Sequence, residues 1–258
     1  MGFEVDNNGR SFYQPNVFYI NFNPSYLNSN GTPKPDSIPI FFHEYAHLIQ
    51  DTTTIFGINS FMSFHDVIQD VFRITSLSAK IKIPVSDKSS WMSFIDQYNK
   101  CIYPREAWPS QAMWAFDGYE IDEVTINCNA DEYDVPIIKA RFIDNTGKHL
   151  PILHEIGVRE IKEAYSIAVE NIHSEIEHDY YPLSEFQYAA IERILLKKFG
   201  YIDNKGIVTI CHWSLNSLHP AIEFFEIIED IERDQVTLTW DDLYIFLRNR
   251  FNEKTHLS

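Results

Sequence analysis

Two histidines and a glutamate lie within five residues of one another, at His43, Glu44 and His47. Histidines four residues apart project from the same face of an α-helix, one turn from each other, so their imidazoles can bind one metal ion. The glutamate next to the first histidine can then reach a water molecule on that metal and take its proton. This H-E-x-x-H spacing is typical of zinc hydrolases, most often metalloproteases, which cleave peptide bonds.

The residues around the motif predict a buried helix over residues 38–50. Pro39 suits the first turn, where its missing N–H is not needed, and Ser37 or Asp36 can be the N-cap. Burying two histidines and a glutamate in such an apolar helix without a partner would be costly, so a metal site is favoured over two surface histidines beside a solvated glutamate. Five apolar or aromatic side chains can pack into the core around the polar residues: Ile40, Phe41, Tyr45, Leu48 and Ile49.

A catalytic zinc ion usually has three protein ligands and one open position. No histidine follows His47 at the spacing of H-E-x-x-H-x-x-G-x-x-H, so we expect a glutamate on a second helix as the third ligand. Residues 156–170 have a helical apolar stripe and contain Glu163, which is followed by small residues that allow a close approach to the first helix. Glu160, one turn earlier, is the rival ligand, and Glu170, two turns later, is a candidate to support a ligand histidine.

These two segments resemble the gluzincin-type metallopeptidases, the H-E-x-x-H enzymes whose third ligand is a glutamate on a downstream helix. Many of them carry a Glu-Ala-x-Ser-like step at that glutamate, and Glu163 is followed by Ala164 in this chain. The resemblance implies that His43, His47 and Glu163 bind zinc and that Glu44 is the general base.

The resemblance covers two short helices, which about 115 residues separate. It departs from the pattern of thermolysin-like members at Ile167, where those proteins often have an aspartate. Asp51 lies one turn beyond His47 and could accept the second N–H of a ligand histidine, which would fix its tautomer. The alternative for Asp51 is a polar residue that only marks the end of the helix.

The chemistry expected of this site is hydrolysis of an amide. Zinc lowers the pKa of a bound water toward neutrality, and Glu44 takes the proton and returns it to the leaving amine. A tyrosine or histidine normally helps to stabilise the oxyanion. The sequence offers seven candidates for that residue and does not choose between them: Tyr165, His173, His178, Tyr180, Tyr181, His212 and His219.

The motif leaves two other functions open. One is a zinc-bound interaction or effector module without proteolysis, and the other is a non-peptidase zinc amidohydrolase such as a deacetylase. The intact Glu44 favours an enzyme, because a degenerate site tends to lose its base before its ligands. We therefore expect a zinc metallopeptidase with a protein or peptide substrate, and we expect a regulatory protein partner because a free intracellular protease is hazardous.

The composition of the chain limits the partners and the cellular location that we expect. A formal net charge of −16 over 258 residues speaks against a nucleic-acid or membrane partner, since such surfaces need clustered Lys and Arg. Cys101, Cys128 and Cys211 form no CxxC pair, so neither a disulfide framework nor a cysteine zinc site is indicated. No secretory signal and no apolar run of membrane-spanning length is present, and we expect a cytoplasmic protein.

The pattern along the chain predicts one zincin-like domain over residues 1–258, of α+β class and mostly α, with a small β-sheet or hairpin and a helical C-terminal part. A strand over 17–22 could lie beside the metal helix and bind substrate at its edge, as in many zincins. Strands over 119–128 and 135–143 predict a hairpin within a β-rich insertion, residues 108–151, between the two zinc helices. Further helices are predicted over 59–80, 91–98, 184–199, 220–231 and 239–252.

Overall fold

The computed structural model describes residues 11–15, 17–76, 90–102, 114–128, 131–174 and 186–256. The described chain has the α+β class expected from the sequence: it is mostly helical and has two small antiparallel sheets. Within these ranges no helix combines the length and the apolar character needed to cross a membrane.

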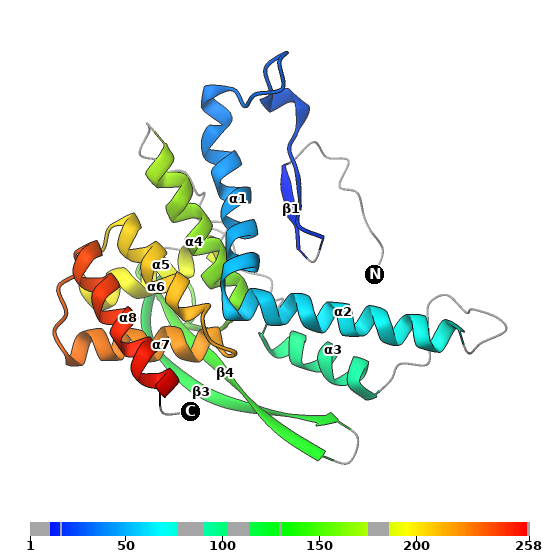
Figure 1. Ribbon diagram of the computed structural model, residues 1–258. Helices are drawn as coiled ribbons and strands as arrows, with labels where there is room; N and C mark the ends of the chain where they lie inside the picture. Colours follow the sequence, from blue (N-terminus) through cyan, green and yellow to red (C-terminus); the bar gives the residue numbers. More distant parts are fainter. Residues whose placement is uncertain are drawn as a thin grey trace.

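The predicted metal helix is α1, which runs from Ile38 to Thr53. Pro39 lies in its first turn and Ser37 is the N-cap residue, as the sequence predicts. α1 packs lengthwise against α4 (Val158–His173), as Figure 1 shows, although the two helices are far apart in the chain. Ser166, which is fully buried, is a small residue at this seam, where its hydroxyl contacts side chains of α1.

A short β-hairpin lies along the side of α1, formed by β1 (Phe12–Gln14) and β2 (Tyr19–Asn21) (Figure 1). The sequence predicts a single strand over 17–22, whereas the structure places Val17 and Phe18 in the turn and adds β1 as its partner. Phe18 has a φ of 50°, and its ring lies 4.9 Å from the ring of Phe61 in the next helix, α2 (Ile55–Ser76). The hairpin is therefore held against both α1 and α2.

Helices α2 (Ile55–Ser76) and α3 (Ser90–Ile102) form an arm that projects from the body of the molecule (Figure 1). Both helices extend beyond their predicted N-terminal ends, and residues 77–80 of the first prediction lie outside the described residues. α2 starts so close to α1 that a Cβ on Gly57 would lie 2.4 Å from the Cα of Asp51. Only glycine permits this approach, because no real Cβ contact is that short.

The second sheet has the order β3–β4–β5 and is antiparallel throughout. Its strands are β3 (Trp114–Cys128), β4 (Asp131–Asp144) and β5 (Ile152–Ile156). The predicted hairpin is confirmed, although both strands are longer than the sequence suggests and β5 was not predicted. The part of β4 nearest the body is core: Ile138 and Phe142 are fully buried, whereas the first four residues of the strand are exposed. The predicted insertion thus shares its core with the rest of the described chain.

The C-terminal part is helical, as predicted, and covers the sheet and the far side of α4. Of the expected helix over 184–199, residues 184 and 185 lie outside the described residues. The helix over residues 204–214 was not predicted, because its run of β-branched residues has a strand-like propensity that tertiary packing overrides. The four helices are α5 (Phe186–Phe199), α6 (Asn204–Ser214), α7 (Pro220–Arg233) and α8 (Trp240–His256).

Ion pairs join α7 to α8. The guanidinium of Arg250, which is 11% exposed, contacts the carboxylates of Glu223 and Asp230. Lys254 lies 2.9 Å from Glu223 and 2.7 Å from Glu226. Each of these acidic side chains is thus paired with at least one permanent cation.

Candidate metal centre

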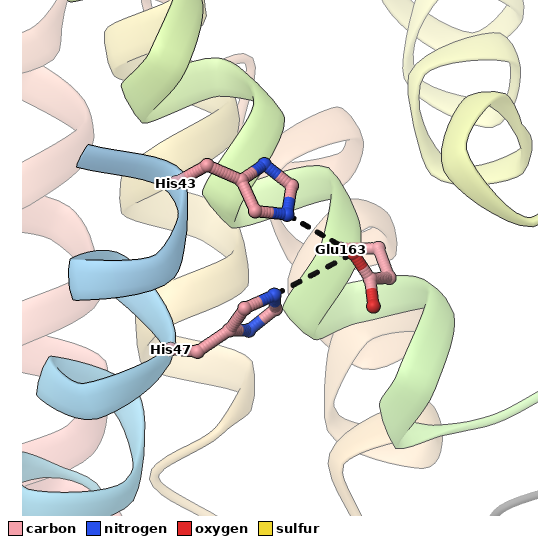
Figure 2. A group of neighbouring side chains, drawn as sticks. All are labelled: His43, His47 and Glu163. Atoms are coloured by element: carbon pink, nitrogen blue, oxygen red, sulfur yellow. Dashed lines mark ion pairs between the residues drawn. The ribbon is translucent and has the colours of Figure 1, made fainter. Parts of the chain in front are cut away.

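The structure brings together three of the residues that the sequence nominates, His43 and His47 from α1 and Glu163 from α4. Figure 2 shows both imidazoles pointing from α1 toward the Glu163 carboxylate. One carboxylate oxygen, Oε2, lies 3.5 Å from the Nε2 of each histidine. The three candidate ligand atoms all lie within 4.8 Å of one another, and the side chains are only 12 to 19% exposed.

These separations suit ligands of one metal ion. Nitrogen and oxygen ligands bind zinc at about 2.1 Å, and two of them on a tetrahedral ion are about 3.4 Å apart. The observed 3.5 Å is close to that separation and longer than an ordinary hydrogen bond. The donor set, two imidazoles and one carboxylate, is one that catalytic zinc sites use. The residues present therefore fit a zinc ion.

The other nitrogen of His43 is oriented by a carboxylate from α4. Its Nδ1 lies 3.1 Å from Oε2 of Glu170. An ionised carboxylate only accepts hydrogen bonds, so Nδ1 carries the proton and donates it. In the neutral imidazole this leaves the lone pair on Nε2, the atom that faces Glu163. Glu170 thus fixes the tautomer that metal binding requires, and it does so from two turns beyond Glu163 rather than from position 167.

The tautomer of His47 follows from the orientation of Gln50. The Nε2 of Gln50 donates to the carbonyl of Lys162 at 3.0 Å, and a carbonyl can only accept. Its Oε1 must therefore be the atom that lies 3.1 Å from Nδ1 of His47, which donates to it. The hydroxyl of Ser166 lies 3.2 Å from the same Nδ1. Both candidate ligand histidines thus present the Nε2 lone pair to the same carboxylate oxygen.

Asp51, which the sequence nominates for this supporting role, binds elsewhere. Its Oδ1 accepts a hydrogen bond of 2.6 Å from Nζ of Lys162, and both side chains are largely buried. The pair ties the end of α1 to α4 one turn below the histidines. Gln50 takes the position expected for Asp51, because it lies on the same face of α1 as His47 and Lys162 binds the carboxylate of Asp51.

The electrostatics of the cluster favour a cation. Burial lowers the pKa of His43, but the neighbouring carboxylates of Glu163 and Glu170 outweigh that effect and raise the pKa from 6.5 to about 10. Burial raises the pKa of Glu163, yet the two histidines hold it well below its usual range. Without a metal, the carboxylates therefore hold a proton on imidazole at neutral pH. A metal cation can take the place of that proton.

Glu44 lies on the side of α1 that the N-terminal hairpin covers and is 9% exposed. Burial raises its pKa, while His43, His47 and the backbone of Tyr13 in β1 act in the opposite direction. The ring of Tyr13 also stacks on the ring of His47, with centroids 6.3 Å apart and an interplanar angle of 17°. Strand β1, which the sequence did not reveal, therefore contacts the candidate metal cluster through Tyr13, a residue that sequence reasoning missed.

Glu160, the rival third ligand, has a structural role. Its Oε2 accepts a hydrogen bond of 2.9 Å from the backbone N–H of Gly157, the N-cap residue of α4, and so satisfies one of the free N–H groups at the start of this helix. Its other oxygen lies 3.5 Å from His154, and both side chains are 2% exposed. The structure groups Glu163, and not Glu160, with the two histidines.

Of the seven candidates for the oxyanion-stabilising residue, four lie within the described residues and three do not. His178, Tyr180 and Tyr181 lie outside the described residues. Among the described candidates, none forms a hydrogen bond or ion pair with the three clustered residues. Tyr165 is buried with its ring 6.3 Å from that of His212, and His173 stacks on Phe42. The last of them, His219, lies 6.1 Å ring to ring from Tyr98 of α3.

Comparisons with known proteins do not extend the resemblance that the two helices suggest. No protein-family model matches the chain, and neither the curated proteins nor the solved structures contain a match. The geometry of the cluster is therefore the basis on which a function can be argued.

Proposed function

We propose that this protein is a zinc-dependent metallopeptidase with a zincin-like core, formed by α1, α4 and the β1–β2 hairpin. His43, His47 and Glu163 are the zinc ligands, and a protein or peptide is the substrate. One observation carries the proposal: a single carboxylate oxygen lies 3.5 Å from two imidazole Nε2 atoms. Both imidazoles have their Nδ1 proton directed to an acceptor, so both are prepared to bind a metal.

The chain's own residues supply the remaining steps of hydrolysis. Zinc, when bound, contributes a Lewis acid that activates water and polarises the scissile carbonyl. Glu44 accepts the proton of the attacking water on its carboxylate and delivers it to the leaving nitrogen. Its burial raises its pKa and so makes it a stronger base. Glu170 and Gln50 keep the two imidazoles oriented throughout.

The proposal is tested by separating metal binding from catalysis. The purified protein should contain close to one zinc per chain by elemental mass spectrometry, and it should cleave members of a peptide library derived from whole-cell protein, read out by mass spectrometry. Glu44→Gln should retain the zinc and lose the cleavage. Glu253→Gln, the same change at an exposed position of α8, should retain both.

Three results would contradict the proposal. Zinc that is absent from the wild type, or cleavage that survives in Glu44→Gln, rejects the metallopeptidase directly. Zinc that is bound without cleavage of any peptide would favour the non-peptidase amidohydrolase or the zinc-bound interaction module. Release of acetate from acetylated lysine peptides would then distinguish these two.

A further inference from the structure

A cavity of about 330 Å³ lies in the arm, between α2 and α3 and beside the loop that joins α6 to α7. In Figure 1 the arm projects away from the contact between α1 and α4, where the candidate metal cluster lies. The cavity's residues are distinct from the metal cluster and from the groups that orient it. Its volume is at the lower end of the range found for small-molecule sites, about 300 to 1,000 Å³.

The walls of the cavity are mostly apolar. Phe56, Phe64 and Val67 contribute from α2, and Phe94 and Ile102 contribute from α3. None of the described residues that line it is charged. An ion would lose its hydration there without gaining a countercharge, so the walls select for a neutral occupant.

A few polar side chains interrupt this apolar lining. The hydroxyls of Ser60 and Ser63 make no hydrogen bond in the described structure, although both side chains are partly buried. Elsewhere on α2 the hydroxyls of Thr75 and Ser76 donate to backbone carbonyls of their own helix. The two cavity serines are thus left available to donate to, or accept from, an occupant. Asn99 of α3 adds an amide at the edge of the cavity.

Helix α2 carries apolar side chains although most of its residues are not buried. It has 22 residues, of which only Phe56 and Gly57 are buried. Its stripe of Phe64 and Val67 faces the cavity rather than closing tightly against α3. A void between two apolar helices loses the packing contacts that a filled interior would have. An occupant of matching polarity would restore them.

We propose that this cavity binds a small neutral molecule with an apolar body and at least one hydrogen-bonding group. The apolar body contacts the phenylalanine-rich walls, and the hydrogen-bonding group reaches Ser60 or Ser63. This binding is independent of the proposed metallopeptidase activity, because no metal ligand lines the cavity.

The test uses N-phenyl-1-naphthylamine, a neutral fluorescent probe with one N–H donor, titrated into the full-length protein. We expect saturable binding of one probe per chain with enhanced emission. Ser63→Leu fills the cavity and should weaken binding at least tenfold. Ser76→Leu, the same change on the same helix outside the cavity, should bind as the wild type does.

Three further arms of the experiment keep the proposal falsifiable. The anionic analogue 1-anilinonaphthalene-8-sulfonate should bind at least tenfold more weakly than the neutral probe, and removal of metal with a chelator should leave neutral-probe binding unchanged. If Ser63→Leu fails to fold by circular dichroism, Ser60→Ala and Ser63→Ala together should weaken binding severalfold by removing both hydroxyls. Absence of saturable binding, equal binding by Ser63→Leu and Ser76→Leu, or unchanged binding by the double alanine variant would overturn the proposal.

Discussion

The carboxylates between α7 and α8 face permanent cations, whereas the carboxylate of Glu163 between α1 and α4 faces two imidazoles. In the first cluster Arg250 and Lys254 neutralise Glu223 and its neighbours at hydrogen-bond distance. In the second, one oxygen of Glu163 lies midway between two nitrogens at 3.5 Å, farther than an ordinary hydrogen bond.

The difference shows which acidic cluster has side chains that could bind a metal ion. Guanidinium and ammonium groups stay protonated at neutral pH, so the α7–α8 cluster is already balanced. Imidazoles can lose a proton and become ligands, and the α1–α4 cluster spaces them as a tetrahedral ion would. The chain has 37 acidic residues, so a cluster of carboxylates alone does not identify a candidate metal site. The side chains that face the carboxylate do, because imidazoles can bind a metal whereas guanidinium and ammonium groups cannot.

The largest expected effect comes from removing the carboxylate of Glu163. Glu163→Ala should weaken zinc binding about a thousandfold, roughly a third of the binding free energy of a structural zinc site. Competition with a chromogenic chelator measures the affinity.

Glu160→Ala is the matched control for that change. It removes the acceptor for the backbone N–H of Gly157 at the start of α4 and should lower stability by about 1 kcal/mol with zinc affinity unchanged. Loss of zinc in Glu160→Ala with retention in Glu163→Ala would transfer the third-ligand assignment to Glu160.

Disrupting the cluster between α7 and α8 should affect folding and leave the metal alone. Arg250→Met leaves Glu223 and Asp230 partly buried without the guanidinium, which we expect to cost about 2 to 4 kcal/mol of unfolding free energy. Urea denaturation measures the stability, and zinc affinity of the folded variant should equal that of the wild type. A change in zinc affinity would mean that the two clusters are coupled and that the contrast between them is wrong.

A smaller effect on the metal is expected from Glu170. Glu170→Gln keeps an acceptor for the Nδ1 proton of His43 but removes the negative charge, and changes of this kind typically weaken metal binding about 10- to 100-fold. The chelator competition assay applies here too. Unchanged affinity would show that the charge of Glu170 does not contribute to binding.

The smallest expected effect is on the stability of the fold at acidic pH. Burial raises the pKa of Asp230, but Arg250 and Arg233 outweigh it, so the folded-state pKa lies below 3.8. A lowered pKa stabilises the fold fully above the unfolded value, and the contribution is lost as pH falls through the folded value. Between about pH 5 and about pH 3, Arg250→Met should therefore lose less stability than the wild type. An equal or steeper loss in the variant would exclude Asp230 as a contributor.

Local patterns in the sequence predicted the elements that carry the candidate ligands. The i, i+4 histidines defined α1, and the apolar stripe around Glu163 defined α4. The sequence did not predict β1, which has three residues, or α6, whose β-branched run is held helical by long-range packing. The sequence offered Asp51 either as the acceptor for a ligand histidine or as a polar residue at the helix end, whereas in the structure Gln50 accepts from His47. The choice depends on Lys162, which is 112 residues away from Gln50 and binds both Gln50 and Asp51.

The close approach of α2 to α1 gives a way to search for distant relatives. Gly57 tolerates no side chain because its neighbour is the backbone of Asp51, and Gln50 orients the second histidine. A protein with the same close contact between these two helices would have the pattern His-Glu-x-x-His-x-x-Gln, with a glycine seven residues after the glutamine. That composite pattern is far more selective than the five-residue motif alone, and it can be read from sequence where whole-chain similarity has faded.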